Sequence, residues 1–483
     1  MVYACGFVRR NYTQTVAVHS RTSTLFDARW AAMAAATVAL SVLAGAFAAE
    51  SGEAPSLPVI ALLALAGGVV LFSVPPHVLF LAWFLIAPFV QESASYTEVG
   101  RPLGFALYLA PPLVFAIWTL TRASESIRPR FLDVFPLAYL LYVVVSLLVT
   151  GDPSSTLLKG VYTSIGIGIV LYYFFAIGPI GSLTRENIAA VLLLITVAEG
   201  VMSIVDVLIG WNLWHDTGWQ LAQSRAVATL ANPAVLGSLL GMGIVLGVAI
   251  LVWNGPARLR ILAIVAIGVG LPGLFFTLTR APILATLAVV ILILMSRAKT
   301  QLVAIAALAV AVVAVTASWS TISASTVYRE RVTNSGNVEA RVLIQDWSLK
   351  LAAERPLFGW GYDSFDRAKN AARLSSGELP ASVGIANTSH NSYLTILVEY
   401  GAVGLALLAI PWLLIPWRAL RTAVREPPGM REPQSRWFVV GAVAALIIFV
   451  LSANTIDVKY FSFVPAVPWL LLGILRRPQL ARR

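Results

Sequence analysis

The chain alternates long apolar runs with short polar connections, and it has one long polar stretch at residues 320–392. A helix of about 20 apolar residues crosses the hydrocarbon core of a bilayer, and its backbone must be hydrogen-bonded internally there. The chain is therefore predicted to be an all-α polytopic integral membrane helical bundle of about 12–14 transmembrane helices. The predicted spans lie near residues 30–49, 57–74, 77–91, 103–120, 134–150, 157–177, 188–209, 232–253, 260–278, 281–296, 302–319, 402–417, 437–453 and 460–475.

Composition supports this class. Of 483 residues, 58% are hydrophobic and only 12% are charged, against about a quarter charged in soluble proteins. The single cysteine, Cys5, excludes a disulfide framework and a paired-thiol metal site. The net charge of +11 reports orientation in a membrane protein, so no nucleic-acid partner is expected.

Basic residues predict the orientation. Twenty-one of the 34 lysines and arginines fall in connections on the same side as both predicted termini. The positive-inside rule makes that side cytoplasmic. We therefore expect a multi-pass protein of the cytoplasmic (inner) membrane with both termini cytoplasmic. The expected parts are a cytoplasmic tail (1–29), eleven spans (30–319), an extracytoplasmic catalytic loop (320–392), C-terminal spans (393–475) and a second cytoplasmic tail (476–483).

The long loop is the expected place for chemistry, because irregular polar sequence must sit in water or line a wet cavity. ATP and nucleotide sugars are absent outside the cytoplasmic membrane. A transfer reaction there needs a substrate that is already activated, most plausibly one linked to a lipid. Within the loop, helical spacing places the apolar residues Trp347 and Leu351 on one face of a helix. It places the polar residues Arg341 and Ser348 on another face. This predicts an amphipathic helix against the outer end of the bundle.

His390 is the strongest catalytic candidate among the four histidines. It lies in the motif "NTSHNSY", where helix-capping residues precede an apolar run. A helix N-terminus disfavours imidazolium and keeps the ring neutral, which is the state that a general base needs. The alternative is a purely structural histidine.

Two arginines are expected at outer helix entrances. Arg280, in "TLTRAPILA", occupies a connection of almost no length between two apolar spans, and Arg225 holds a similar position. A guanidinium offers planar bidentate bonding to a diphosphate and keeps its charge. The alternatives are a snorkelling or topology-setting arginine, or a partner for an internal acid.

Two acids are predicted within one span. Glu199 and Asp206 are seven residues apart on one helix, so they share a face. They could orient an arginine or a sugar hydroxyl, or form a proton path, and we favour a structural salt bridge. The outer loops have neither an Asp-Asp pair nor a His/Glu cluster with metal spacing, so neither a metal nor a cofactor is expected.

Three segments, "TLTRAPILATL", "EARVLIQDWSLKLAAERPLFGWGYDSF" and "SHNSYLTILVEYGAVGLALL", together resemble the O-antigen ligase and O-antigen polymerase family. The resemblance covers about residues 220–415. The chain departs from the family pattern at Ala281, where a glycine is expected, and in "ATLANP". The residues that carry the pattern in order are Arg341, Trp347, Pro356, Gly359, Gly361, Phe365, His390, Asn391, Glu399, Gly401 and Gly404, with Arg280, Asn232 and Pro233 upstream.

The resemblance implies a metal-independent inverting glycosyltransferase of surface polysaccharide biosynthesis. It would move a glycan from polyprenyl (undecaprenyl) diphosphate to an acceptor hydroxyl at the outer face of the cytoplasmic membrane. His390 and Arg341 would be catalytic, and Arg225, Arg280 and Arg341 would bind the diphosphate. The implied supporting residues are Asn391, Glu399, Trp347, Gly359 and Gly361.

The acceptor stays open. A ligase, a repeat-unit polymerase and a protein O-glycosylase would share the donor and use a lipid, glycan or protein acceptor respectively. A transporter or flippase of lipid-linked saccharides is the competing class, because it also needs many spans and inward-facing charges. A non-catalytic scaffold of a polysaccharide assembly complex is a third possibility.

Overall fold

The computed structural model describes residues 76–91, 129–150, 161, 165–178, 184–211, 225–230, 232–302, 305–306, 336–376, 383, 386, 388–425, 434–457, 461 and 463–477. Every regular element in these ranges is a helix, which confirms the predicted fold class of a polytopic helical membrane protein. The predicted spans 30–49, 57–74 and 103–120, most of 302–319, the tail 1–29 and residues 478–483 lie outside the described residues.

The other ten of the fourteen predicted spans each coincide with a helix. In the part of the chain that the structure describes, five helices are long and apolar enough to cross a membrane, namely Phe131–Val149, Arg185–Ile209, Pro233–Val252, Ala257–Phe276 and Ser392–Val424. The elements are α3 (Pro76–Gln91), η2 (Phe131–Asp133), α6 (Val134–Thr150), α8 (Ile167–Ile177), α9 (Arg185–Ile209), α11 (Pro233–Val252), α12 (Ala257–Phe276), α13 (Arg280–Met295), α17 (Gly336–Glu354), α18 (Phe365–Ser376), α20 (Ser392–Arg425), α21 (Gln434–Ser452) and α22 (Phe463–Arg476).

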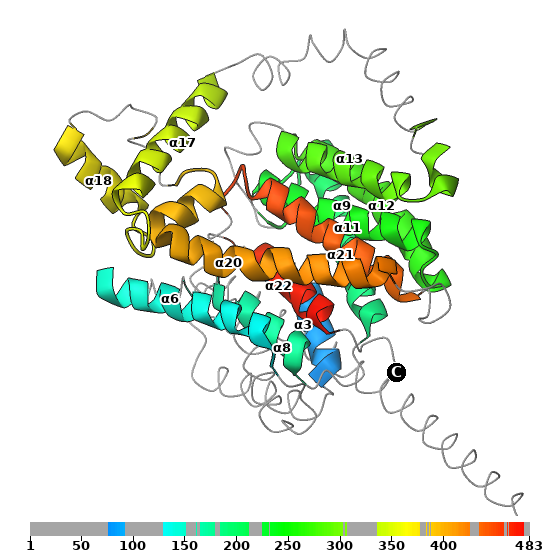
Figure 1. Ribbon diagram of the computed structural model, residues 1–483. Helices are drawn as coiled ribbons and strands as arrows, with labels where there is room; N and C mark the ends of the chain where they lie inside the picture. Colours follow the sequence, from blue (N-terminus) through cyan, green and yellow to red (C-terminus); the bar gives the residue numbers. More distant parts are fainter. Residues whose placement is uncertain are drawn as a thin grey trace, which may run out of the picture.

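Helix α11 is the centre of the bundle, packed among α9, α12, α13 and α21 (Figure 1). Asn232 caps it by accepting from the N–H groups of Ala234 at 2.9 Å and Val235 at 3.3 Å, and Pro233 occupies the first turn. Nearly all of α11 is buried. Close packing depends on small residues, since a methyl group at Gly241 would lie 2.5 Å from Thr286 Oγ1.

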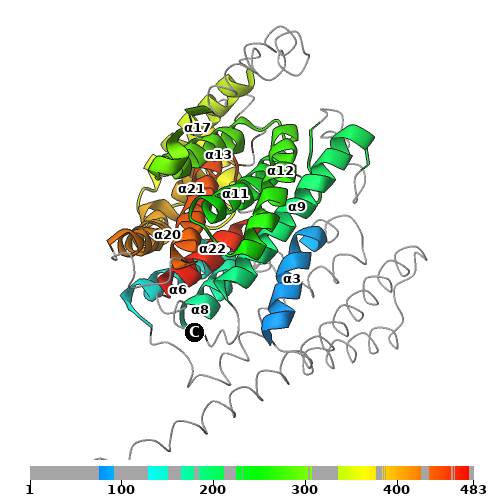
Figure 2. The ribbon, with the colours of Figure 1, turned by 90° about the vertical axis from the view of Figure 1, so that its right-hand side faces the viewer.

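A second layer places α20 along α6, and α22 against α8 and α20. Figure 2 shows α3 beside α9, far from α6 and α20. The Trp469 ring of α22 joins this layer, with its centroid 5.4 Å from Trp412 and 6.1 Å from Tyr172. Aromatic contacts of this kind tie helices from distant parts of the chain together.

Helices α17 and α18 project from one end of the bundle and contact the first turns of α20 (Figure 1). Ile344 and Leu351 of α17 are buried in a small separate core with Trp360 and Val398. A helix is therefore present, with Arg341 exposed, but the predicted separation into an apolar and a polar face is wrong, because Val342 and Leu349 are 60% and 52% exposed. The prediction that Ser348 lies on the polar face is wrong, because Ser348 is buried and its hydroxyl donates to Ile344 O at 2.7 Å. A serine hydroxyl can donate to a main-chain carbonyl of its own helix, so the polarity of a serine does not determine whether it faces solvent or the core.

Candidate functional site

His390 lies two residues before α20, in a short polar turn at the end of the bundle that carries α17 and α18. Its backbone has φ of 54°, a left-handed conformation that is uncommon outside glycine. The turn is held by hydroxyl groups: the His390 N–H donates to Thr388 Oγ1 at 3.1 Å, and the Ser389 hydroxyl donates to Asn391 O at 2.6 Å. These bonds fix the backbone that carries the imidazole.

Asn391 is the N-cap of α20. Its side-chain oxygen accepts from the N–H groups of Tyr393 at 3.0 Å and Leu394 at 3.3 Å, and its amide donates to Asn454 Oδ1 at 2.9 Å. The Ser392 N–H donates to Ala453 O at 2.9 Å. The start of α20 is therefore joined to the end of α21, and the prediction that His390 lies near a helix N-terminus is confirmed.

The charges around His390 come from two other elements. Burial lowers the pKa of the His390 imidazole, the cation of Arg341 lowers it further, and the carboxylate of Asp457 acts in the opposite direction. Part of the His390 surface is exposed to solvent. The surrounding protein still removes water from the imidazole, and this loss of water is the main cause of the lowered pKa. The ring is therefore neutral at physiological pH. We expected the helix dipole to cause this, whereas burial and Arg341 are the causes found.

Asp457 is a site residue that the sequence reasoning missed. It is 5% exposed and follows α21, in the connection that also holds Asn454. The sequence contains a signal that could have identified Asp457. It is an acid in the short connection "SANTIDVKY" between two predicted spans, on the same predicted side of the membrane as His390.

Gly359 and Gly361 bring the end of α17 onto α20. The helical path of α20 breaks at Gly401, which has φ of 63°. The Gly361 N–H then donates to Glu399 O at 2.7 Å, and the Ala402 N–H donates to Pro356 O at 2.8 Å. This main-chain exchange between residues 356–361 and 398–403 is called the backbone crossing below.

The backbone crossing demands glycine at two positions. Gly359 has φ of 68°, and a Cβ atom there would lie 2.6 Å from Tyr400 N. A Cβ atom at Gly401 would lie 2.6 Å from Phe358 N. Glu399 contributes its carbonyl to the crossing, while its buried carboxylate lines a cavity described below. The glycines of the motif therefore position the chain around the site.

Trp347 packs against the core that joins α17 to α20, and the Lys350 ammonium lies 5.0 Å from its ring centroid. At this position Trp347 supports α17, the helix that carries Arg341. Hydrophobic contacts at this junction hold an otherwise exposed helix against the bundle.

Arg225 and Arg280 form a second group at the turn between α12 and α13. The Arg225 guanidinium donates from Nε to Thr277 O at 3.0 Å and from Nη2 to Thr279 Oγ1 at 2.8 Å. Arg280 follows as the first residue of α13 and is exposed. Arg225 therefore holds the turn from which Arg280 emerges.

The two groups lie at the same end of the bundle. Thr286 of α13 and Ile448 of α21 both flank Gly241, so α13 begins where α21 ends. Helix α20 also begins there (Figure 1). The structure thus brings Arg341 close to His390 and sets Arg225 and Arg280 on the same end through a different pair of helices.

The expected salt bridge of Glu199 and Asp206 is wrong. Asp206 Oδ2 accepts from the N–H groups of Val227 at 2.9 Å and Ala228 at 3.1 Å, and Glu199 accepts from both the N–H and the hydroxyl of Thr229. Both acids therefore fix the irregular segment 225–230, which carries Arg225. A buried non-helical backbone needs such acceptors, and this need outweighed pairing with a cation.

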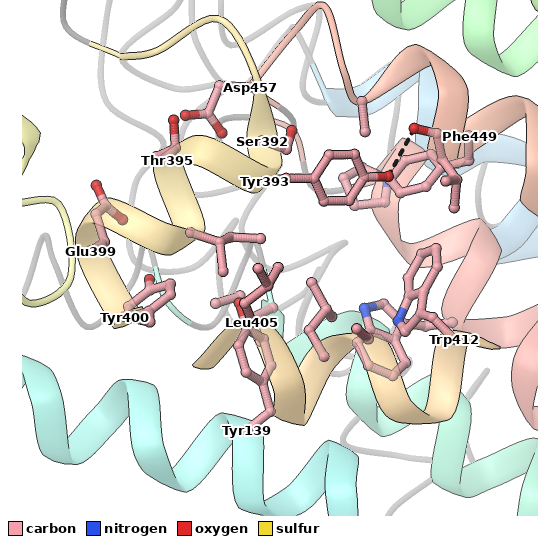
Figure 3. A pocket seen from close by; sticks show the side chains of 18 of the residues that line it. Tyr139, Ser392, Tyr393, Thr395, Glu399, Tyr400, Leu405, Trp412, Phe449 and Asp457 are labelled. Atoms are coloured by element: carbon pink, nitrogen blue, oxygen red, sulfur yellow. Dashed lines mark hydrogen bonds between the residues drawn. The ribbon is translucent and has the colours of Figure 1, made fainter. Parts of the chain in front are cut away.

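A mostly apolar cavity of about 190 Å³ begins beneath the His390 turn. It runs along α20 from Ser392 to Leu413 and is closed by residues of α6, α21 and α22. Figure 3 shows Asp457, Glu399 and Thr395 at one side of it and the aromatic rings of Trp412 and Phe449 at another. The Tyr393 hydroxyl is turned away to Val450 O, at 2.8 Å. The cavity suits an apolar chain with a polar end near Asp457.

Within the described residues, no group of three or more His, Cys, Asp or Glu side chains is arranged to hold a metal ion. The site chemistry available there is an imidazole, guanidiniums and buried carboxylates. This combination can take up a proton and bind a phosphate anion.

Comparison with known families agrees with this arrangement. Residues 269–409 match the family model described as O-antigen ligase, a range that contains Arg280, Arg341, the backbone crossing and His390. No curated protein shows significant similarity to the chain. The match supports an O-antigen ligase-like membrane enzyme that transfers glycosyl groups. It confirms the resemblance in the motifs and shows that residues 269–409 are similar to the O-antigen ligase family.

Proposed function

We propose that the chain transfers a glycan from a polyprenyl diphosphate to an acceptor hydroxyl at the extracytoplasmic face of the cytoplasmic membrane. The observation that carries the proposal is the surroundings of His390, where burial and Arg341 favour the neutral imidazole. A neutral imidazole can accept a proton from a hydroxyl, and the adjacent cation suits a phosphate.

The reaction is a single displacement with inversion. The acceptor oxygen attacks the anomeric carbon while the bond from that carbon to the diphosphate oxygen breaks. The acceptor proton passes to a ring nitrogen of His390, and the polyprenyl diphosphate leaves with the bonding electrons. Asp457 would stabilise the imidazolium formed in this step, since its carboxylate already favours the protonated ring.

Arg341 would bind the diphosphate beside His390, with Arg280 and Arg225 reaching it from the α12–α13 turn. Charge grows on the diphosphate as the bond breaks, so preorganised guanidiniums stabilise the transition state more than the bound donor. Two donors of Arg225 already hold the turn, so we assign it mainly to positioning Arg280.

The apolar cavity along α20 would take the part of the isoprenoid chain next to the diphosphate. Leu408, Trp412 and Phe449 make part of its lining apolar, and Asp457 lies at its polar side. This would hold the diphosphate at the height of the arginines. When donor and acceptor are held at one site, a bimolecular reaction becomes effectively intramolecular.

The test is transfer by the purified full-length protein in nanodiscs, given a polyprenyl-diphosphate-linked glycan and a candidate acceptor. The acceptors are a lipid A-core, a second lipid-linked glycan and a protein. We expect His390→Ala and His390→Gln to lower kcat by about 10²- to 10⁴-fold. Asn370→Ala, an exposed position on α18, serves as the control and should keep full activity.

Transfer that persists in both His390 variants would overturn the proposed role of His390. The competing classes give other results: a flippase would move the lipid-linked substrate across the membrane in His390→Ala, and a scaffold would leave glycan output unchanged. Glu199 and Asp206, the acids that could form a proton path in a transporter, accept hydrogen bonds from the backbone of residues 227–229.

A further inference from the structure

A second cavity, of about 250 Å³, lies among η2, α20, α21 and α22 and is rich in guanidiniums. Among the described residues that line it are five arginines and no acidic residue. These arginines are Arg130, Arg185, Arg418, Arg436 and Arg476. The rest of the lining is mainly apolar, as at Ile415, Val439 and Leu475.

This cavity is at the opposite end of the bundle from His390. Helix α20 begins beside His390 at Ser392, and it reaches the cavity only near Arg418. Helix α21 runs the other way, from Arg436 at the cavity to the segment that bonds Asn391. The cavity is therefore separate from the site proposed for transfer.

Arg476 is the residue that most needs an explanation. Its side chain is 5% exposed, and it binds Asp133 through Nε at 2.8 Å and Nη2 at 2.6 Å. The hydroxyl of Tyr172 donates to the same carboxylate at 2.7 Å. Arg476 Nη1 is buried and has no hydrogen-bond partner among the described residues. A buried unsatisfied donor is unfavourable, especially on a charged group.

An orientation signal alone does not explain this arrangement. Basic residues that set topology need only lie near the membrane surface, where each side chain stays hydrated. Here a guanidinium is buried in a cavity with apolar walls, and exposed Arg130 and Arg418 line the same cavity. A bound anion would satisfy Nη1 and offset the repulsion among the cations.

We propose that this cavity binds a phosphate group through Arg476, Arg418 and Arg130. Guanidiniums pair with phosphate oxygens in a planar bidentate manner, and basic pockets between membrane helices suit lipid head groups. The phosphate would belong either to an anionic phospholipid or to a soluble phosphate or diphosphate. The apolar part of the lining suits the phospholipid.

The test measures binding to the full-length protein in phosphatidylcholine nanodiscs, by native mass spectrometry and by fluorescence titration. The probes are short-chain phosphatidylglycerol, inorganic phosphate and inorganic diphosphate, with chloride at equal ionic strength as the non-phosphate anion. Arg418→Gln and Arg130→Gln test the cavity. Arg421→Gln is the matched control, because it is exposed on the same helix and lies outside the cavity lining.

We expect each cavity substitution to weaken binding about fivefold, as for one basic contact to an anionic head group, and Arg421→Gln to bind like the unsubstituted protein. Binding of phosphatidylglycerol alone identifies a lipid source, and binding of the inorganic probes identifies a soluble one. The proposal is overturned if no phosphate probe binds, if chloride competes equally, or if Arg421→Gln weakens binding as much as Arg418→Gln.

Discussion

The two ends of the helix bundle hold their charged groups by different means. At the end with the arginine-lined cavity, Arg476 is fixed by a buried bidentate ion pair with Asp133, to which Tyr172 adds a hydrogen bond. At the other end, main-chain bonds fix the elements that carry the charges. The backbone crossing holds α17 with Arg341, and the bond from the Ser392 N–H to Ala453 O joins α20 to the segment before Asp457.

The difference follows from what each end must do in the proposed reaction. His390 changes its charge during turnover, so an ion pair there would strengthen and weaken with each proton transfer. Main-chain hydrogen bonds are indifferent to that change. Arginine keeps its charge at all relevant pH values, so the ion pair of Arg476 is constant. The turn that carries His390 is thus held by neutral hydrogen bonds, whereas Arg476 is held by an ion pair.

Breaking the ion pair tests this contrast with the largest expected effect. Arg476→Gln leaves the buried Asp133 carboxylate without its cation, and we expect a loss of about 3–5 kcal/mol in stability. Arg258→Gln removes an ion pair with Glu186 whose arginine side chain is 74% exposed, and we expect at most about 1 kcal/mol. Thermal unfolding of both variants in detergent measures the difference, and equal losses would contradict the assigned role of burial.

The backbone crossing is tested by adding one methyl group. In Gly359→Ala the new Cβ atom meets the main chain of α20 at a position with φ of 68°, so we expect a loss of about 1–3 kcal/mol together with reduced transfer. Gly268→Ala is the control, because its Cβ atom would meet nothing within 4 Å. In a helix interior that change stabilises by up to about 1 kcal/mol. Unfolding temperatures that fall equally in both variants would refute the crossing as the cause.

The charges near His390 are tested by the acidic limb of the activity profile. The pKa of His390 lies below its ordinary value, so the base form is kept as the pH falls until that lowered pKa is reached. Arg341→Gln removes a cation that lowers this pKa, so the limb moves to higher pH. Asp457→Asn removes the anion that raises it, so the limb moves to lower pH.

The measurement is kcat/KM of the residual activity against pH, with Lys350→Gln as the control on the same exposed helix. Burial remains the main cause in every variant, so neither substitution should restore the ordinary pKa. Shifts of the same sign in the two variants, or no shift in either, would show that these two groups do not set the charge of His390.

The sequence predicted the features that depend on local pattern. Ten spans coincide with helices, and the capping residues before "SYLTIL" predicted the place of His390. The helix that carries Arg341 was also predicted from its spacing, although its exposed and buried faces were not. Each of these depends on neighbours within a few turns of one helix.

The features that failed depend on contacts between distant segments. Nothing near Asp206 in the sequence indicates that its partners are the N–H groups of Val227 and Ala228. Asp457 is 67 residues after His390, and Arg130 and Arg476 line one cavity from opposite parts of the chain. The sequence assigned these arginines one by one to the orientation of the chain, and only the packed structure shows that they converge.

The backbone crossing places a particular constraint on how this protein can diverge. Main-chain groups make its bonds, so the side chains of Leu357 and Phe358, which are 58% and 64% exposed, take no part in them. Those two positions are free to drift during evolution, whereas Gly359, which follows them directly, is not. Among relatives that keep this architecture, two variable residues should therefore stand immediately before an invariant glycine.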